Sequence, residues 1–205
     1  MNKKDYFLQV FKLAEKKYGE HEKRLAGDGW KYGWQTLIAT IMSAQTRDEV
    51  TIPVAENLFM KYDSVEKLSK AKVSDVLKII KSVNFSKTKA KNVVNTAKML
   101  VRDYRGSVPD EIENLVKLPG VGRKTANLVL SEVHEKDAIC IDTHCQRLLN
   151  VLGIVNTKTP HQTEIEMMKI VPKRYWSRIN RIFVLWGKDV RGRDKKVLLR
   201  QINMR

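Results

Sequence analysis

Apolar residues recur every three or four positions along nearly the whole chain, and this helical spacing is the strongest constraint on the fold. Near the N-terminus it is carried by Phe7, Val10, Phe11, Ala14 and Tyr18. The same spacing predicts helices over residues 7–18, 34–43, 50–59, 76–80 and 86–104, followed by a short helix over residues 112–116. Sustained alternation of apolar and polar residues, which is typical of half-buried strands, is missing. The sequence therefore predicts an all-α fold.

The charge of the chain is strongly positive: 39 Lys and Arg against 23 Asp and Glu give +16. Two segments hold most of it, residues 81–105 with a net charge of +6 and residues 173–205 with +9. Such clustering predicts surfaces that bind a polyanion, most often nucleic acid. The alternative for either segment is a solvated, lysine-rich helix face. No apolar run approaches the roughly 18 residues of a membrane span, which excludes an integral membrane protein.

Cys140 and Cys145 are the only cysteines, too few for a disulfide framework or a four-thiolate metal site. Their spacing around His144 is no familiar zinc pattern, so both are expected to be small buried hydrophobes. No metal site is predicted. Residues 1–19 have the pattern of an amphipathic helix and not of a secretory signal, so the expected location is a reducing cytoplasm.

A turn with two glycines lies between two apolar helical segments, in the sequence Leu-Pro-Gly-Val-Gly-Arg-Lys-Thr-Ala at residues 118–126. Pro119 ends the first helix, and Gly120 and Gly122 permit a tight turn with outward-facing backbone N–H groups. These donors start the next helix, where the helix dipole also favours an anion. One DNA phosphate fits such a nest. For a lone Gly-x-Gly, a simple helix-turn-helix corner would be the alternative.

This string, followed 18 residues after Lys124 by Asp142-Thr143-His144, resembles the endonuclease III-type DNA glycosylases of the helix-hairpin-helix superfamily. Similarity extends from about Trp34 to about Pro172. The resemblance implies two helical domains that flank a DNA-binding cleft, one of them containing the helix-hairpin-helix motif. The expected six-helix domain with the hairpin spans residues 26–136, and the second domain combines residues 1–25 with residues 137–205.

The activity that the resemblance implies is a bifunctional DNA glycosylase with AP-lyase activity, acting on damaged bases, with oxidised pyrimidines as the expected substrates. Lys124 is the expected nucleophile: its amine attacks the sugar, forms a Schiff base and nicks the strand by β-elimination. In the family, the residue that matches Asp142 assists the amine and stabilises positive charge on the sugar. Asp142 is also predicted to cap the helix that begins at Thr143.

The expected partner is double-stranded DNA that contains damaged bases or abasic sites, bound by a monomeric protein in the cytoplasm, associated with the chromosome. Three alternatives stay open. Lys124 contacts a phosphate instead of reacting; the chain is a mismatch uracil/thymine-DNA glycosylase on the same fold; or it is a non-catalytic helix-hairpin-helix DNA-binding protein.

Other residues are expected to contact DNA. Gln45 is the expected filler of the gap left by the displaced base, and Phe85 either wedges beside the opposite base or packs into the domain. His144 either binds phosphate or caps the following helix. The remaining candidates are the hairpin residues and the C-terminal cations: Gly120, Val121, Gly122, Arg123, Thr125, Arg191, Arg193, Lys195 and Lys196.

The sequence departs from its family at the C-terminal end. Many family members hold a [4Fe–4S] cluster with four C-terminal cysteines. No cysteine follows Cys145 here, and residues 186–196 are a basic stretch instead. No iron–sulfur cluster and no other cofactor is expected.

Overall fold

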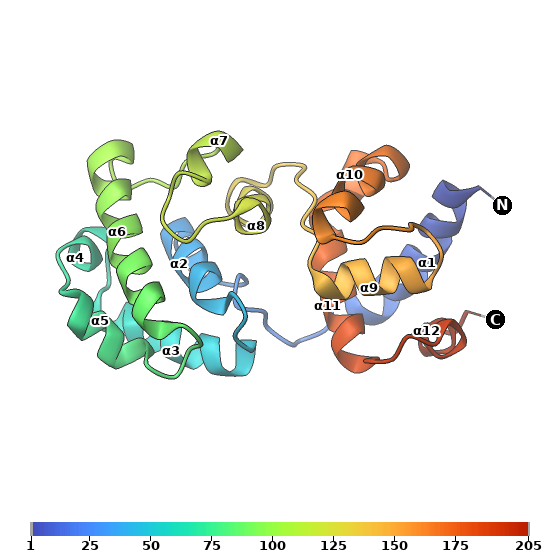
Figure 1. Ribbon diagram of the computed structural model, residues 1–205, viewed down its shortest axis with the longest axis horizontal. Helices are drawn as coiled ribbons and strands as arrows, with labels where there is room; N and C mark the ends of the chain where they lie inside the picture. Colours follow the sequence, from blue (N-terminus) through green and yellow to red (C-terminus); the bar gives the residue numbers. More distant parts are fainter. Residues whose placement is uncertain (1, 205) are drawn as a thin grey trace. The chain divides into compact units, whose positions relative to one another are not determined.

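The computed structural model describes residues 2–204, and every regular element in this range is a helix (Figure 1). The predicted all-α fold is confirmed. The chain forms two compact units. We call Arg24–Glu135 the hairpin unit, and we call Met1–Lys23 with Lys136–Arg205 the terminal unit.

The hairpin unit holds seven helical segments, of which α4 and α7 have only five and four residues. They are α2 (Gly33–Ser43), α3 (Asp48–Lys61), α4 (Val65–Ser69), α5 (Val73–Ile80), α6 (Ser86–Tyr104), α7 (Ile112–Leu115) and α8 (Arg123–His134). All of the helices predicted for this part of the chain are present. The spacing missed α4, whose N-cap Ser64 accepts a hydrogen bond from the Lys67 backbone N–H.

Helix α2 is the centre of the hairpin unit. Every residue from Thr36 to Met42 is buried, so no face of this stretch is left for solvent. Helices α3, α6 and α8 pack against it, with α6 and α8 on either side in Figure 1. Because α2 is held on all sides, the backbone that leaves its C-terminal end at Ser43 starts from a fixed position.

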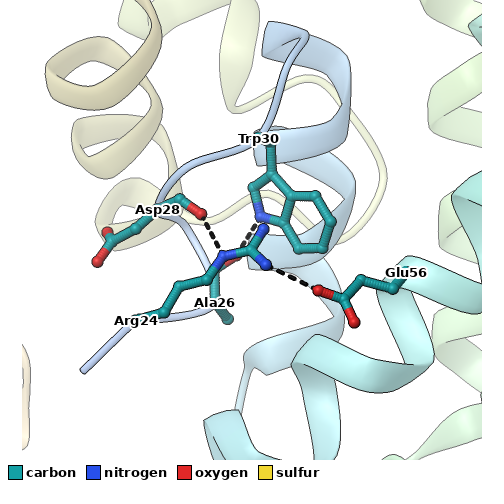
Figure 2. Close-up of polar contacts among 5 residues, drawn as sticks. All are labelled: Arg24, Ala26, Asp28, Trp30 and Glu56. Carbon is teal, nitrogen blue, oxygen red and sulfur yellow. Dashed lines mark hydrogen bonds and ion pairs between the residues drawn. The ribbon is translucent and has the colours of Figure 1, made fainter. Parts of the chain in front are cut away.

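A cluster around Arg24 holds the segment that precedes α2 (Figure 2). The Arg24 guanidinium lies 4.1 Å from the centre of the Trp30 ring and donates to the Asp28 carbonyl (2.9 Å) and to Glu56 Oε1 of α3 (2.8 Å). Trp30 Nε1 donates to the Ala26 carbonyl at 2.7 Å. These contacts fold residues 24–30 against α3 although the segment contains no helix.

The terminal unit consists of α1 (Lys3–Tyr18), α9 (Thr143–Val151), α10 (Pro160–Ile170), a short 3-10 turn η1 (Lys173–Tyr175), α11 (Trp176–Asp189) and α12 (Lys195–Gln201). Helix α1 packs on α11, where Phe7 stacks on Phe183 and Tyr18 on Trp186, with ring centres 6.3 and 6.5 Å apart. The N-terminal helix therefore shares a core with the C-terminal helices. Within residues 2–204, no helix is long and apolar enough to cross a membrane.

Candidate nucleic-acid interface and catalytic residues

The hairpin turn between α7 and α8 depends on Gly120. The Val121 N–H donates to the Leu118 carbonyl (3.1 Å), and Gly120 has a φ of +81°. A Cβ at Gly120 would lie 2.8 Å from Asn92 Nδ2 of α6, so a side chain there would strain the backbone and would force Asn92 to move. Thr96 of α6 donates to the carbonyl of Pro119 at 2.9 Å. The turn is thus held by its own backbone and by α6.

The other hairpin residues divide between anchoring and presentation. Gly122 is the N-cap of α8, and it has no side chain that can accept from the first-turn N–H groups. Gly122, Arg123 and Lys124 are exposed, whereas the side chains of Val121 and Thr125 are buried. A bound anion would therefore meet the backbone and the two cations, while Val121 and Thr125 hold the turn in the core.

Gln45 lies at the tip of a tight turn directly after α2. The Thr46 N–H donates to the Ser43 carbonyl (2.9 Å), Ala44 has φ −53° and ψ 117°, and Gln45 has a φ of +54°. This is the pattern of a type II turn, whose third position favours glycine or asparagine. Gln45 is exposed and holds this left-handed conformation at a cost of roughly 1–3 kcal/mol.

Phe85 has the same character. It precedes α6 with φ 58° and ψ 33°, and it is 65% exposed. The alternative that Phe85 packs into the domain is therefore wrong. A large apolar ring is therefore exposed on a residue in the left-handed conformation.

The structure brings the Gln45 and Phe85 loops together. Asn84 Nδ2 donates to the Gln45 carbonyl (2.5 Å), and the Asn84 backbone N–H donates to Thr46 Oγ1 (3.1 Å). Gln45 and Phe85 could be predicted as functional residues from the sequence, but Asn84 and Lys89, which connect the two loops, could not. A lysine at an apolar position of the α6 pattern, directly before Ala90, was the available signal for Lys89.

Asp142 caps α9, as predicted. Its Oδ1 accepts a hydrogen bond from the Cys145 backbone N–H at 2.8 Å, and the residue is half-buried. His144 does not provide this cap. Its ring packs against Gly187 of α11, where an added Cβ would lie 2.7 Å from His144 Nδ1. Asp142 and His144 belong to the terminal unit, and Lys124 belongs to the hairpin unit.

The guanidinium of Arg147 binds the basic C-terminal stretch. Arg147 of α9 donates to the carbonyls of Gly187 (2.8 Å), Val190 (2.8 Å) and Gly192 (2.5 Å). Asp194 then caps α12 by accepting from the backbone N–H groups of the second and third helix residues, at 2.7 and 3.3 Å. We call residues 187–194, which are the last three residues of α11 and the segment that connects it to α12, the C-terminal loop. The four predicted cations of this region are exposed on the loop and the first turn of α12: Arg191, Arg193, Lys195 and Lys196.

These features agree with comparisons to known proteins. The model of the family described as HhH-GPD superfamily base excision DNA repair protein matches residues 38–173. This range includes the Gln45 and Phe85 loops, the hairpin and Asp142. The chain belongs to the HhH-GPD superfamily of base excision DNA repair proteins.

Within this superfamily the chain is similar to endonuclease III. The Thermotoga maritima endonuclease III is 42% identical over 157 residues, which cover 77% of this chain and 74% of the relative. The Bacillus subtilis endonuclease III is 37% identical over 156 residues, covering 76% and 71%. A solved structure of a trapped endonuclease III–DNA covalent intermediate aligns with a TM-score of 0.84 at 30% identity and covers 94% of this chain and 89% of that chain.

The residues present do not fit a [4Fe–4S] cluster, which needs four cysteine thiolates. Cys140 and Cys145 are the only cysteines, and residues 146–205 contain none. Both are buried, and burial raises the pKa of the Cys145 thiol well above its ordinary value, so this thiol stays protonated. Within the described part of the chain, no group of three or more His, Cys, Asp or Glu is arranged to hold a metal.

Proposed function

We propose that this protein is a bifunctional DNA glycosylase and AP lyase that removes oxidised pyrimidines from double-stranded DNA. The observation that carries the proposal is Lys124 itself. It is an exposed lysine at the second position of α8, directly after a glycine turn whose N-cap, Gly122, has no side chain to cap the helix. The same lysine is followed 18 residues later by Asp142, and family members are known with a covalent link to DNA, as in the trapped endonuclease III–DNA intermediate to which this chain is similar.

The chemistry follows from the amine of Lys124. The neutral Nζ attacks C1′ of the damaged nucleotide, the bond from C1′ to the base breaks, and the base leaves with the bonding electron pair. This leaves an N,O-acetal at C1′; its C1′–O4′ bond then breaks, O4′ takes up a proton, and a Schiff base remains between Nζ and C1′. Removal of a proton from C2′ then expels the 3′ phosphate, which breaks the strand. The endonuclease III relative that was trapped in a covalent complex with DNA fits this route.

We assign Asp142 the task of accepting the proton from the attacking amine and of stabilising the positive charge that develops on the sugar. The helix cap occupies Asp142 Oδ1 with one backbone N–H and fixes the direction of the carboxylate. Capping and catalysis are compatible, because a carboxylate has two oxygens with several acceptor sites.

The base must leave the helix before Lys124 can reach the sugar, and this costs a few kcal/mol. We propose that Gln45 and Phe85 offset the cost. The Gln45 amide hydrogen-bonds the unpaired opposite base, and the Phe85 ring stacks beside it. The two exposed left-handed tips on loops joined by Asn84 support this role.

Phosphate contacts supply most of the affinity in this proposal. The hairpin presents the backbone of residues Gly120 to Thr125 and the side chain of Arg123, and the C-terminal loop and α12 present Arg191, Arg193, Lys195 and Lys196. His144 contributes a further phosphate contact. We place the protein in the cytoplasm, on the chromosome, acting as a monomer without an iron–sulfur cluster. Iron analysis of the purified protein tests the last point, and one cluster per chain would contradict it.

Cleavage of a panel of duplexes tests the activity and its substrate. The panel carries thymine glycol, dihydrouracil, uracil opposite guanine, 8-oxoguanine or an abasic site. We expect base release and strand nicking at thymine glycol and dihydrouracil, and nicking at the abasic site. Uracil release without nicking would instead identify a mismatch glycosylase. Binding without cleavage of any duplex would identify a non-catalytic DNA-binding protein.

A further inference from the structure

Lys89 is a buried lysine of α6, and its ammonium points into the end of α2. Only 5% of the residue is exposed. Its Nζ donates to the carbonyls of Met42 and Ala44, both at 2.6 Å, and to Thr46 Oγ1 at 2.9 Å. An ammonium has three protons, and all three therefore have an acceptor. The distances are those of charge-assisted hydrogen bonds.

Packing alone does not require a charge at this position. Lys89 precedes Ala90, Val93 and Val94, which are fully buried on α6. A methionine would continue this apolar surface without the cost of burying a cation. Burial lowers the pKa of Lys89 to about 8, so the ammonium is the main form at neutral pH. The chain keeps a costly charge where an apolar side chain would fit.

The first thing that this charge holds is the backbone of the Gln45 turn. The last carbonyls of a helix have no N–H partner within the helix, and Lys89 supplies a donor to that of Met42. The carbonyl of Ala44 belongs to the peptide group that joins Ala44 to Gln45. Lys89 therefore fixes the peptide immediately before the left-handed residue.

The second thing that it holds is the Phe85 loop. Thr46 Oγ1 accepts from Lys89 and also from the backbone N–H of Asn84, which precedes Phe85. The Lys89 backbone N–H donates to the Phe85 carbonyl at 3.0 Å. Asn84 closes the arrangement through its side-chain bond to the Gln45 carbonyl. One buried cation thus joins the bases of both exposed tips.

We infer that Lys89 is a positioning residue for base displacement: it holds Gln45 and Phe85 in the conformation that fills the gap in the DNA. The inference rests on the proposed function. Lys89 touches neither the base nor the sugar in this account, and it acts only through the two loops. Its loss therefore impairs the removal of a base from intact duplex more than cleavage at a site where the base is already missing.

Lys89→Met tests the inference, because it keeps the unbranched side chain apart from its terminal atom and removes the charge and all three donors. The measurement is a pair of single-turnover rates: base release from the duplex that the wild type cleaves fastest, and cleavage of the same duplex with a pre-formed abasic site. We expect base release to fall roughly tenfold to a hundredfold, as for the removal of a charged hydrogen bond, with abasic cleavage much less affected. Lys70→Met, an exposed lysine at the end of α4, is the matched control and should leave both rates unchanged.

Equal losses on the two substrates, or no loss on either, in a Lys89→Met protein that unfolds at the wild-type temperature would overturn the inference. If Lys89→Met does not fold, Thr46→Val is measured instead, since it removes the one acceptor that both loops share and keeps the ammonium. The same selective loss is expected there, smaller in size, and an unchanged ratio of the two rates would again overturn the inference. A wild type that releases no base from any duplex overturns the proposed function itself, whereas an active wild type with an unchanged ratio in the variants overturns only the role of Lys89.

Discussion

The hairpin and the C-terminal loop, the two segments that we propose bind phosphates, are held in different ways. The hairpin is held by residues in the turn and directly beside it: Gly120 makes the turn, and Thr96 and Asn92 of the neighbouring α6 lie against it. The C-terminal loop has no such internal pattern. Its shape depends on Arg147, which lies 40 or more residues away in the chain and binds three of its carbonyls.

The difference shows that the residues that determine the conformation of a loop can lie within the loop or far from it in the sequence. In the hairpin, the glycines of the turn itself determine its conformation, so the family can be identified from the sequence of the turn. The C-terminal loop is fixed by an arginine outside it. Its own sequence can therefore diverge as long as its backbone carbonyls still accept from that arginine. In this chain the C-terminal loop, which Arg147 holds, is the segment that departs from the family's four-cysteine pattern.

The largest effect is expected at Asp142, which caps the same helix that carries Arg147. Asn caps a helix about as well as Asp, so Asp142→Asn should change the free energy of unfolding by less than about 0.5 kcal/mol. Base release should nevertheless fall by orders of magnitude, because the carboxylate charge is removed. Urea unfolding and single-turnover base release measure the two effects. A variant that is destabilised and still active would contradict the assignment.

Gly120→Ala should break the hairpin. The left-handed conformation costs an alanine about 1–2 kcal/mol, and Asn92 must move away from the added Cβ. We expect binding to damaged and undamaged duplexes to weaken alike, about tenfold, in a titration at fixed salt. Gly122→Ala is the control for stability, because nothing lies within 4 Å of a Cβ there. If the two variants unfold at the same temperature, the turn does not depend on Gly120.

Arg147→Met should loosen the C-terminal loop and leave the hairpin unchanged. If the loop then stops presenting its cations, the slope of log K against log salt should shrink by roughly 0.9 for each phosphate that the protein no longer neutralises. Replacing Arg191, Arg193, Lys195 and Lys196 with Ser should shrink it in the same way. Adding Arg147→Met to that fourfold variant should then change little. An unchanged slope in both variants would mean that the loop is only a solvated surface.

The smallest effect is a pH dependence of the free energy of unfolding, caused by Lys89 in the hairpin unit. Because the pKa of Lys89 is about 8 in the fold and near 10.5 in the unfolded chain, the folded state binds fewer protons between these values. The stability of the wild type should therefore rise relative to that of Lys89→Met as the pH increases from 8, by at most about 1.4 kcal/mol per pH unit. Urea unfolding of both proteins at pH 7, 8 and 9 checks this. A difference that stays constant with pH would contradict it.

Much of the fold could be predicted from the sequence because its long helices carry regular apolar spacing. The hairpin turn could also be predicted, because its glycines are typical of a tight turn. The cap at Asp142 could be predicted because Asp142 comes directly before an apolar helix. Helix α4 escaped because five residues are too few to show a period. The roles of Lys89 and Arg147 escaped for another reason. Each acts on backbone carbonyls 40 or more residues away in the chain. Because every residue has a carbonyl, the sequence does not indicate which carbonyl a distant side chain will bind.

Covalent trapping with borohydride tests the central claim most directly, because it reduces the Schiff base that an amine nucleophile must form. The wild type should be captured on abasic and damaged duplex DNA as a protein–DNA species that resists denaturation. Lys124→Gln should bind the same duplex with near wild-type affinity, since the hairpin amides and the basic surfaces remain, and should not be captured at all. If Lys124→Gln is captured at the wild-type rate, another amine is the nucleophile and the assignment of the site is wrong.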